Sequence, residues 1–373
     1  MSRNRKAKEI LICILTMVSI LLIVGRNAKA DFVFGEPTNL DPNVLGSGDY
    51  GTPCVSSDGL ELYFSSGQPG SLGSLDIWVA KRTSVSDSWG VPMNPGPPLN
   101  SPDARNCPYC LSNDDLELYF ASRRPGGYGN FDIWVARRET RDHNWEQPIN
   151  LGSKVNGSSY DDGVWVSTDG LELYFHSNRA GGVGSHDIWV SRRATKQESW
   201  GQPENLGAII NSSARDAYPC LSADGLMLFF SGLDLLPPYR PGGFGGSDLW
   251  MATRPTVHDD WEIPVNLGSI INSPSHEEGP RLSMDGSTLY FYAGADWNSV
   301  YLWQASIEPI VDLNGDGIVD AADMCIIVDY WGTDNSLCDI GPMPWGDGIV
   351  DVQDLIVLAE HLFEEYPPAE PVE

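Results

Sequence analysis

One short pattern recurs five times along this 373-residue chain, with a period near 55 residues. Each copy begins with a turn, continues with an alternating run such as Leu60, Leu62 and Phe64, and later reaches an aliphatic residue followed by tryptophan. The alternating runs occupy 58–64, 114–120, 169–175, 224–230 and 285–291, and the tryptophan motifs occupy 76–80, 132–136, 187–190, 248–250 and 301–303. Equal periods of this kind predict a repeat architecture, in which each unit packs against its neighbours.

Each unit is expected to consist of strands. Leu60, Leu62 and Phe64 alternate with Glu61 and Tyr63, which is the period of a half-buried strand, and an Asp-Gly pair before them favours a hairpin. The tryptophan motif predicts a third strand. A fourth is predicted at a Trp-x-x-Pro motif, because proline fits the outer edge of a sheet. This motif occupies 89–92, 145–148, 200–203 and 261–264. Four strands in a unit predict a propeller blade and an all-β fold.

The repeat resembles the propeller repeats of TolB and its exported relatives over roughly residues 32–306. The resemblance implies a β-propeller used as a binding platform, with a motif that is structural and not catalytic. The fifth unit ends at residues 305–306 without a Trp-x-x-Pro motif, whereas residues 34–40 match that motif and have no unit of their own. We therefore predict five blades, with the ring closed by 32–40 pairing against 301–305.

Residues 1–30 have the pattern of an export signal, with basic residues before the apolar run 10–24 and Ala28-Lys29-Ala30 as a cleavage site. This predicts a protein that is secreted or attached to the cell surface, with a mature chain that begins near Asp31. The apolar run is shorter than the about 20 residues of a usual membrane helix. Signal removal leaves a chain more acidic than the formal charge of −28. That balance argues against nucleic acid and anionic membrane as partners, because both are bound through Lys and Arg.

The twelve residues 312–323 carry oxygen-bearing side chains at positions one, three, five, nine and twelve, with glycine at six. A calcium loop requires this spacing, because alternate side chains turn inward, glycine makes the sharp bend, and position seven contributes a backbone carbonyl. The predicted calcium ligands of this loop are Asp312, Asn314, Asp316, Ile318 through its carbonyl, Asp320 and Asp323.

A second copy departs from the pattern at its start. Residues 347–354 repeat loop positions five to twelve, but Met343 and Trp345 stand where positions one and three should offer oxygens. Asp339 can be the first ligand only across a lengthened loop. The predicted ligands of this second, less regular site are Asp339, Asp347, Ile349 through its carbonyl, Asp351 and Asp354. The alternative is a metal-free acidic hairpin, yet fifteen Asp and Glu without Lys or Arg after Val311 favour metal-coupled folding.

A duplicated loop-helix unit of about sixty residues, with aspartate at position twelve, resembles a type I dockerin. The resemblance implies calcium-dependent docking onto a cohesin module of a scaffold or surface protein, in polysaccharide-related work. In dockerins, loop positions ten and eleven contribute to partner choice; here they are Ala321, Ala322, Val352 and Gln353. The predicted organisation is a signal peptide at 1–30, a propeller at 31–306, a linker at 307–311, a dockerin-like calcium domain at 312–366 and a Pro/Glu tail at 367–373.

The strand framework is shared, so a ligand site is expected where the units differ. The entry position of each first strand differs from unit to unit and is polar, as are its neighbours. Radial blades would bring these residues around one mouth of a central channel, where a glycan or protein ligand would bind. The predicted lining residues are Tyr50, Arg105, Asn106, Tyr160, Asp161, Asp162, Arg215, Asp216, His276, Glu277 and Glu278.

The rival prediction is a glycoside hydrolase. Five-bladed propellers include arabinanase-like hydrolases with three carboxylates from different blades, a role open here to Asp161, Asp216 and Glu277, with Glu277 as the acid. Hydrolysis needs two carboxylates at a defined distance, one of them protonated. The flanking sequences match no hydrolase motif, and His176 and His186 are expected at the surface. A binding module is therefore the first prediction, and an architectural spacer the third.

The chain keeps six cysteines after signal removal, and an even number permits disulfides in an exported protein. Cys325 and Cys338 bracket the first tail helix and are the predicted pair. Cys54, Cys110 and Cys220 occupy one equivalent position in three units, which favours buried thiols between blades over a zinc site.

Overall fold

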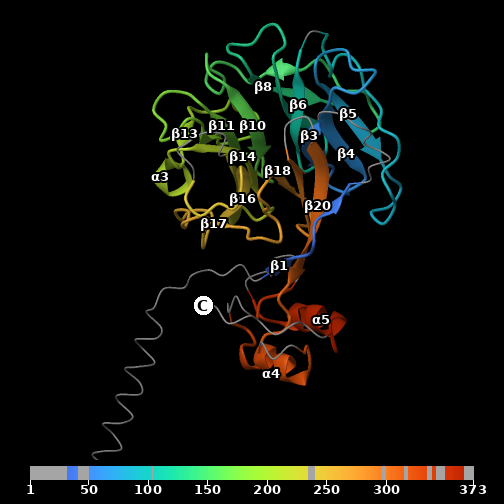
Figure 1. Ribbon diagram of the computed structural model, residues 1–373, viewed down its shortest axis with the longest axis vertical. Coiled ribbons are helices and arrows are strands. Elements are labelled where there is room, and N and C mark those ends of the chain that lie inside the picture. The colour runs from blue at the N-terminus through green and yellow to red at the C-terminus, as the bar shows by residue number, and fades with distance from the viewer. Residues whose placement is uncertain are drawn as a thin grey trace, which may run out of the picture. The chain divides into compact units, whose positions relative to one another are not determined.

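The computed structural model describes residues 32–40, 50–102, 104–233, 240–295, 300–314, 318–333, 338–341 and 349–364 (Figure 1). The predicted signal peptide lies outside these residues. Strands dominate the described part, whose helices are α3 (Gly207–Ile210), α4 (Ala321–Asp329) and α5 (Val352–Glu360). None of the helices described is long and apolar enough to cross a membrane.

Three antiparallel strands open each repeat unit, as the alternation predicts. The strands are β3 (Tyr50–Val55), β4 (Glu61–Ser66) and β5 (Asp76–Lys81); β6 (Asn106–Leu111), β7 (Glu117–Ser122) and β8 (Asp132–Arg137); β10 (Asp161–Val166), β11 (Glu172–Ser177) and β12 (Asp187–Arg192); β14 (Arg215–Leu221), β15 (Met227–Leu233) and β16 (Ser247–Thr253); and β18 (His276–Leu282), β19 (Thr288–Gly294) and β20 (Val300–Pro309). Glycine takes a left-handed φ in the first hairpin, at Gly59 (+71°). Asp115 takes the same region at +58° in the second unit, which lacks that glycine, because aspartate tolerates it better than most residues.

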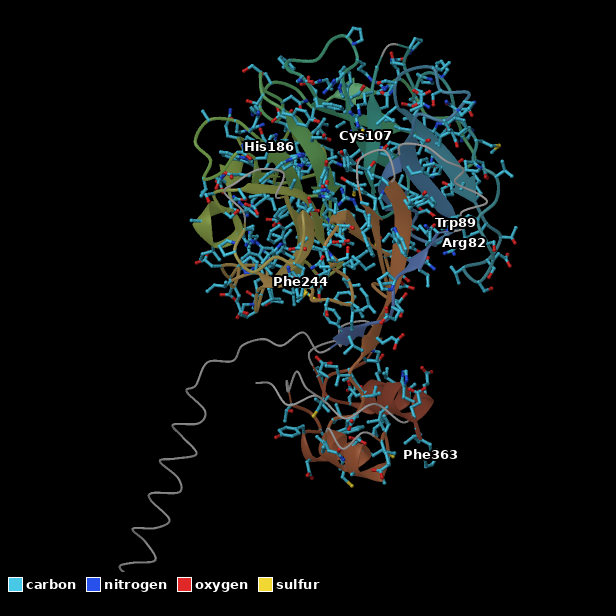
Figure 2. All side chains as sticks on the ribbon, in the orientation of Figure 1. Arg82, Trp89, Cys107, His186, Phe244 and Phe363 are labelled. Carbon is cyan, nitrogen blue, oxygen red and sulfur yellow. The ribbon has the colours of Figure 1, made fainter. Side chains whose placement is uncertain are left out.

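The fourth strands are short and lie just beyond the predicted place. They are β9 (Ile149–Asn150), β13 (Glu204–Asn205) and β17 (Val265–Asn266), paired with β8, β12 and β16. Each begins directly after the proline of its Trp-x-x-Pro motif, because proline has no N–H to donate to a ladder. The tryptophan of the motif packs inward instead; Arg82, for example, stacks over Trp89 at 4.2 Å from the ring centre (Figure 2).

The N-terminal segment pairs with the last strand of the fifth unit. β2 (Thr38–Asn39) pairs antiparallel with Trp303 and Gln304 of β20, which is the predicted partner segment. β1 (Phe32–Phe34) pairs with 307–309, farther along β20 than predicted. Residues 307–309, expected to be linker, therefore continue a strand.

The first strands of successive units lie against one another in the order β3, β6, β10, β14 and β18, and β18 also contacts β3. Single parallel bridges tie each third strand to the next first strand, as between Leu75 and Arg105 and between Phe131 and Tyr160. Both faces of the second strands are buried, as along the whole of β4. The described strands thus form a mostly β, propeller-like fold (Figure 1).

The two tail helices repeat each other and contact one another (Figure 1). Each starts with a capping box, in which Asp320 with Asp323, and Asp351 with Asp354, exchange side-chain and backbone hydrogen bonds. Val319 of the first loop and Val350 of the second are fully buried in one small core with residues of both helices. The tail therefore folds as a symmetric pair of loop-helix units.

Candidate functional site

The entry residue of each first strand anchors the loop that precedes it. Asp161 accepts hydrogen bonds from the Gly157 amide and the Ser177 hydroxyl, both at 2.7 Å, and from Arg179 Nη2 at 2.5 Å. These bonds satisfy both carboxylate oxygens of a fully buried side chain. Asp161 therefore has a structural role, because a buried charge must be paired and hydrogen-bonded to be tolerated.

The other entry residues repeat this arrangement. Asp216 accepts from Arg240 Nη1 at 2.6 Å, and Asn106 accepts from Arg124 Nη2 at 3.0 Å. Glu277 accepts from the backbone amide four residues earlier at 3.0 Å. The three candidate catalytic carboxylates are thus fixed within their own units, and none of them lines the central cavity. For Tyr50, the structure describes the strand and not the side chain.

The central cavity lies between the first strands and has a volume of about 380 Å³. Three residues of the predicted lining, Arg105, Tyr160 and Asp162, do line it. Tyr109, Tyr218 and Tyr292 line it as well, with ring centres of neighbouring tyrosines 6.0 Å apart. Tyrosine faces beside charged groups are suited to a polar ligand with an apolar face.

Two buried carboxyl groups flank the entry column: Asp162 lines this cavity, whereas Glu278 does not line it but bonds to Tyr292, which does. Asp162 accepts from the Gly163 amide at 2.8 Å, and Glu278 accepts from the Tyr292 hydroxyl at 2.8 Å and the Ser247 hydroxyl at 2.9 Å. Burial raises the pKa of both carboxyls, and the charge of Arg215 opposes that rise. The cavity lining therefore combines one acid of raised pKa, Asp162, with the cationic side chain of Arg105.

Arg215 and His276 complete the predicted set. Arg215 Nε is buried and has no hydrogen-bond partner among the described residues, and its guanidinium lies 5.8 Å from the ring centre of Tyr218. His276 Nδ1 lies 3.2 Å from the Ser247 hydroxyl, which also donates to Glu278. Among the predicted lining residues, Arg215 and Asn106 thus each keep one buried donor without a partner in the part of the chain that the structure describes.

His176 and His186 were expected at the surface, and that prediction is wrong for His176. The His176 side chain is fully buried, its Nδ1 accepts from the Tyr218 amide at 3.3 Å, and its ring centre lies 5.8 Å from that of His186. Burial lowers the pKa of His176 well below the ordinary value and that of His186 to about 4, so both are neutral at pH 7. His186 is half-buried, with its ring centre 5.7 Å from that of Tyr160. Nothing in the sequence indicates that His176 is buried. It lies on β11, a second strand with both faces buried, where alternation does not separate core from surface positions.

Arg281 lies between the first strands with only 2% of its surface exposed. Its Nε donates to the Tyr109 carbonyl at 2.8 Å, and its Nη1 donates to the carbonyls of Pro219 at 3.0 Å and Pro280 at 2.7 Å. Bulges in β6, β14 and β18 interrupt the ladders at these residues, so the carbonyls need another donor. Within the described residues Arg281 has no carboxylate partner. The arginine thus joins three units through backbone acceptors, and its guanidinium also lies 5.7 Å from the ring centre of Trp165 in β10.

On the far side of Arg281 the space is narrow. The cavity lined there by Arg281, Cys54 and Trp165 has a volume of about 30 Å³, the size of one water molecule. Cys54, Cys110 and Cys220 are buried free thiols, as predicted. The predicted disulfide between Cys325 and Cys338 is wrong, because Cys325 is exposed on α4 whereas Cys338 is buried in the tail core.

The two tail loops have the same hydrogen-bond pattern, each around its own aspartate. The amides of residues 313 and 314 donate to Asp323 Oδ1 at 2.8 and 3.1 Å, and that of Asp320 donates to Oδ2 at 2.8 Å. The amides of residues 340 and 341 donate to Asp354 Oδ1 at 2.6 and 2.8 Å in the same way. Asp323 and Asp354 therefore hold equivalent places.

This equivalence fixes the register of the second loop. Asp339 precedes 340–341 as Asp312 precedes 313–314, so Asp339 stands at position one and Gly341 at position three. Gly341 brings no side-chain oxygen, and the second loop spans sixteen residues where the first spans twelve.

The donor chemistry of the first loop suits calcium, since carboxylate, amide and carbonyl oxygens are its preferred ligands. Asp316 and Asp347 lie outside the described residues. Among those described, no three acidic, histidine or cysteine side chains form a metal-binding group. Of the predicted docking residues, Ala321, Ala322 and Val352 are exposed, and Gln353 is partly so.

No family model matches this chain, and no curated protein matches it. Among solved structures, TolB from Acinetobacter baumannii is 15% identical with a TM-score of 0.44; the match covers 71% of this chain and 56% of that protein. An α-L-arabinofuranosidase from Lactobacillus brevis is 12% identical with a TM-score of 0.46, over 73% of this chain and 94% of that one. An exo-β-1,3-galactanase from Clostridium thermocellum is 14% identical with a TM-score of 0.45, over 73% and 61%.

Proposed function

We propose that this protein is an exported binding module. In this proposal a five-bladed β-propeller, closed by β2, holds a polar ligand such as a glycan in its central cavity. A dockerin-like tail folds with calcium and docks the module onto a cohesin-type partner of a scaffold or cell surface. The observation that supports the tether best is the equivalent hydrogen-bond pattern around Asp323 and Asp354, since one of these two loops has the spacing of a calcium loop and the other keeps part of it.

Bound calcium would supply the positive charge that the acidic tail lacks. In the first loop the ion would be held by Asp312, Asn314, Asp316, the Ile318 carbonyl, Asp320 and Asp323. In the second loop it would be held by Asp339, Asp347, the Ile349 carbonyl, Asp351 and Asp354, with position three left to solvent. The first site is expected to bind more tightly, because it has one more oxygen ligand and a shorter loop to order.

Adding calcium to the chelated, full mature chain should slow amide exchange throughout α4 and α5. Folding of the acidic tail is coupled to neutralisation of its carboxylates, so protection should rise by at least about tenfold. Hydrogen exchange followed by mass spectrometry measures this for residues 312–364. Asp323→Ala should abolish the effect in the first loop. Asp329→Ala, an exposed acid on the same helix, should leave it intact; equal exchange with and without calcium would refute the tether.

The central cavity supports the ligand-binding part of the proposal. Its tyrosines offer faces for a sugar ring, and Arg105 and Asp162 offer the charged hydrogen-bonding groups that fix orientation. Screening the mature chain on a glycan panel should find a ligand whose affinity falls at least about tenfold in Asp162→Asn and Arg105→Ala. Arg137→Ala, an exposed residue paired with Glu117, is the matched control. If no glycan of the panel binds, the result would favour an architectural spacer over a binding module.

A glycoside hydrolase is the second candidate. The observation that favours it is the pair Asp162 and Glu278, whose pKa values are both raised by burial, as a general acid requires. The three carboxylates predicted from sequence as catalytic, Asp161, Asp216 and Glu277, have less support, because Asp161 and Asp216 form buried ion pairs. Release of reducing sugar by wild type but not by Glu278→Gln would establish hydrolysis.

A further inference from the structure

In three of the repeats an arginine packs against an aromatic pair of its own unit. Arg124, Arg179 and Arg240 each lie over a phenylalanine of the second strand, with the guanidinium 4.7 to 4.9 Å from the ring centre. Each also lies 4.8 to 5.5 Å from the centre of the tryptophan in the third strand. The same aromatic pair therefore holds a cation three times.

Each of these arginines also meets the same two acceptors. One is the entry residue of the first strand: Asn106, Asp161 or Asp216. The other is a carbonyl from the loop before it, of Leu99, Val155 or Ile210, at 2.5 to 2.8 Å. Two aromatic rings, an entry acceptor and a loop carbonyl thus make a repeated guanidinium site.

The fifth unit has this site without its arginine. Arg124 and Arg179 stand two residues after the partner of the entry residue, Ser122 or Ser177. In the fifth unit that partner is Ala293, so Ala295 stands in the arginine's place. A cavity of about 470 Å³ opens there. In the first unit the position belongs to Gln68.

All four components of the site line this cavity. Glu277 is the entry residue, Phe291 and Trp303 are the aromatic pair, and Ile271 stands in sequence where Ile210 offers its carbonyl. Trp303 is partly exposed, whereas the equivalent Trp134, Trp189 and Trp250 are 5 to 7% exposed. Burial chiefly raises the pKa of Glu277 to about 7, as fits a carboxylate without a cationic neighbour.

We propose that this fifth-unit cavity binds a guanidinium group from outside the chain, an arginine side chain or a small guanidine, at a site separate from the central cavity. A planar guanidinium stacks between aromatic rings and donates to a carboxylate and a carbonyl at once, as the three internal arginines do. An ammonium is a compact, strongly hydrated charge that matches this arrangement less well. We infer a guanidinium as the ligand because arginine side chains of this protein occupy the equivalent position in three other units.

Titration of the mature chain with agmatine, followed by Trp fluorescence and calorimetry, tests the proposal. Agmatine should bind at least about tenfold more tightly than putrescine, a diamine of the same charge, and Glu277→Gln should weaken agmatine binding about tenfold or more. Equal affinity for both cations, or no effect of Glu277→Gln, would overturn the proposal. A peptide with a central arginine, compared with its lysine analogue, shows whether a protein side chain also enters; binding of agmatine alone would assign a small-molecule ligand.

A second variant tests the same site without added ligand. Ala295→Arg restores the internal arginine, so it should raise the melting temperature and abolish agmatine binding. Ala295→Gln, of similar length but neutral, should do neither. If Ala295→Arg folds and still binds agmatine with wild-type affinity, the ligand lies elsewhere and the proposal fails.

Discussion

Deleting residues 31–40 from the mature chain is expected to lower its melting temperature by about 8 °C, at a slope of about 2 °C per kcal/mol for a domain of this size. The deletion removes both strands that pair with β20. It also exposes the surroundings of Phe32 and Leu40, which are 7% and 4% exposed. Burial of two such side chains contributes about 4 kcal/mol. Differential scanning calorimetry of the two forms measures the shift.

Val33→Ser is the matched control for this deletion. Val33 is 44% exposed and takes part in β1 through its backbone, so the substitution should change the melting temperature by less than about 1 °C. A deletion form that melts with the wild type would show that the N-terminal segment does not close the ring.

Replacing Arg281 by leucine should cost about 4 kcal/mol of unfolding free energy, the range found when a buried polar network loses one partner. Leucine fills part of the volume but leaves the carbonyls of Tyr109, Pro219 and Pro280 without a donor at the point where three units meet. Urea unfolding at constant m-value measures the loss. Arg192→Leu, which removes exposed ion pairs with Glu172 and Glu204, should cost under about 1 kcal/mol. Similar losses in the two variants would contradict the role assigned to Arg281.

The repeat pattern was sufficient to predict the strands and the pairing of the N-terminal segment, because period and alternation report directly on burial. Thr38 and Asn39 follow a proline as the fourth strands of other units do, and they pair with β20 accordingly. The exact start of the fourth strands was not predicted: they begin after the proline, four residues beyond the start of the predicted motif, because proline has no N–H to donate to the ladder.

The candidate site was predicted only in part, because equivalent positions do not reveal which way a side chain points. Asp161 and Asp216 looked like channel acids, but each meets an arginine 18 to 24 residues farther along the chain. Asp162, one residue on, faces the cavity instead. The role of Arg281 could not be predicted from sequence. Its hydrogen-bond partners are backbone carbonyls at β-bulges, and every residue has the same backbone carbonyl.

The position of Arg281 also determines how the central cavity exchanges its contents. The space on the Cys54 side of Arg281, about 30 Å³, is too small for a sugar ring, so the pocket described there offers a sugar no passage. If the proposed glycan site is the central cavity, a long polymer would therefore not thread past Arg281, and a chain end, a side branch or a small molecule would be the expected ligand. Binding should accordingly depend on the number of ends in a polymer sample and not on its mass.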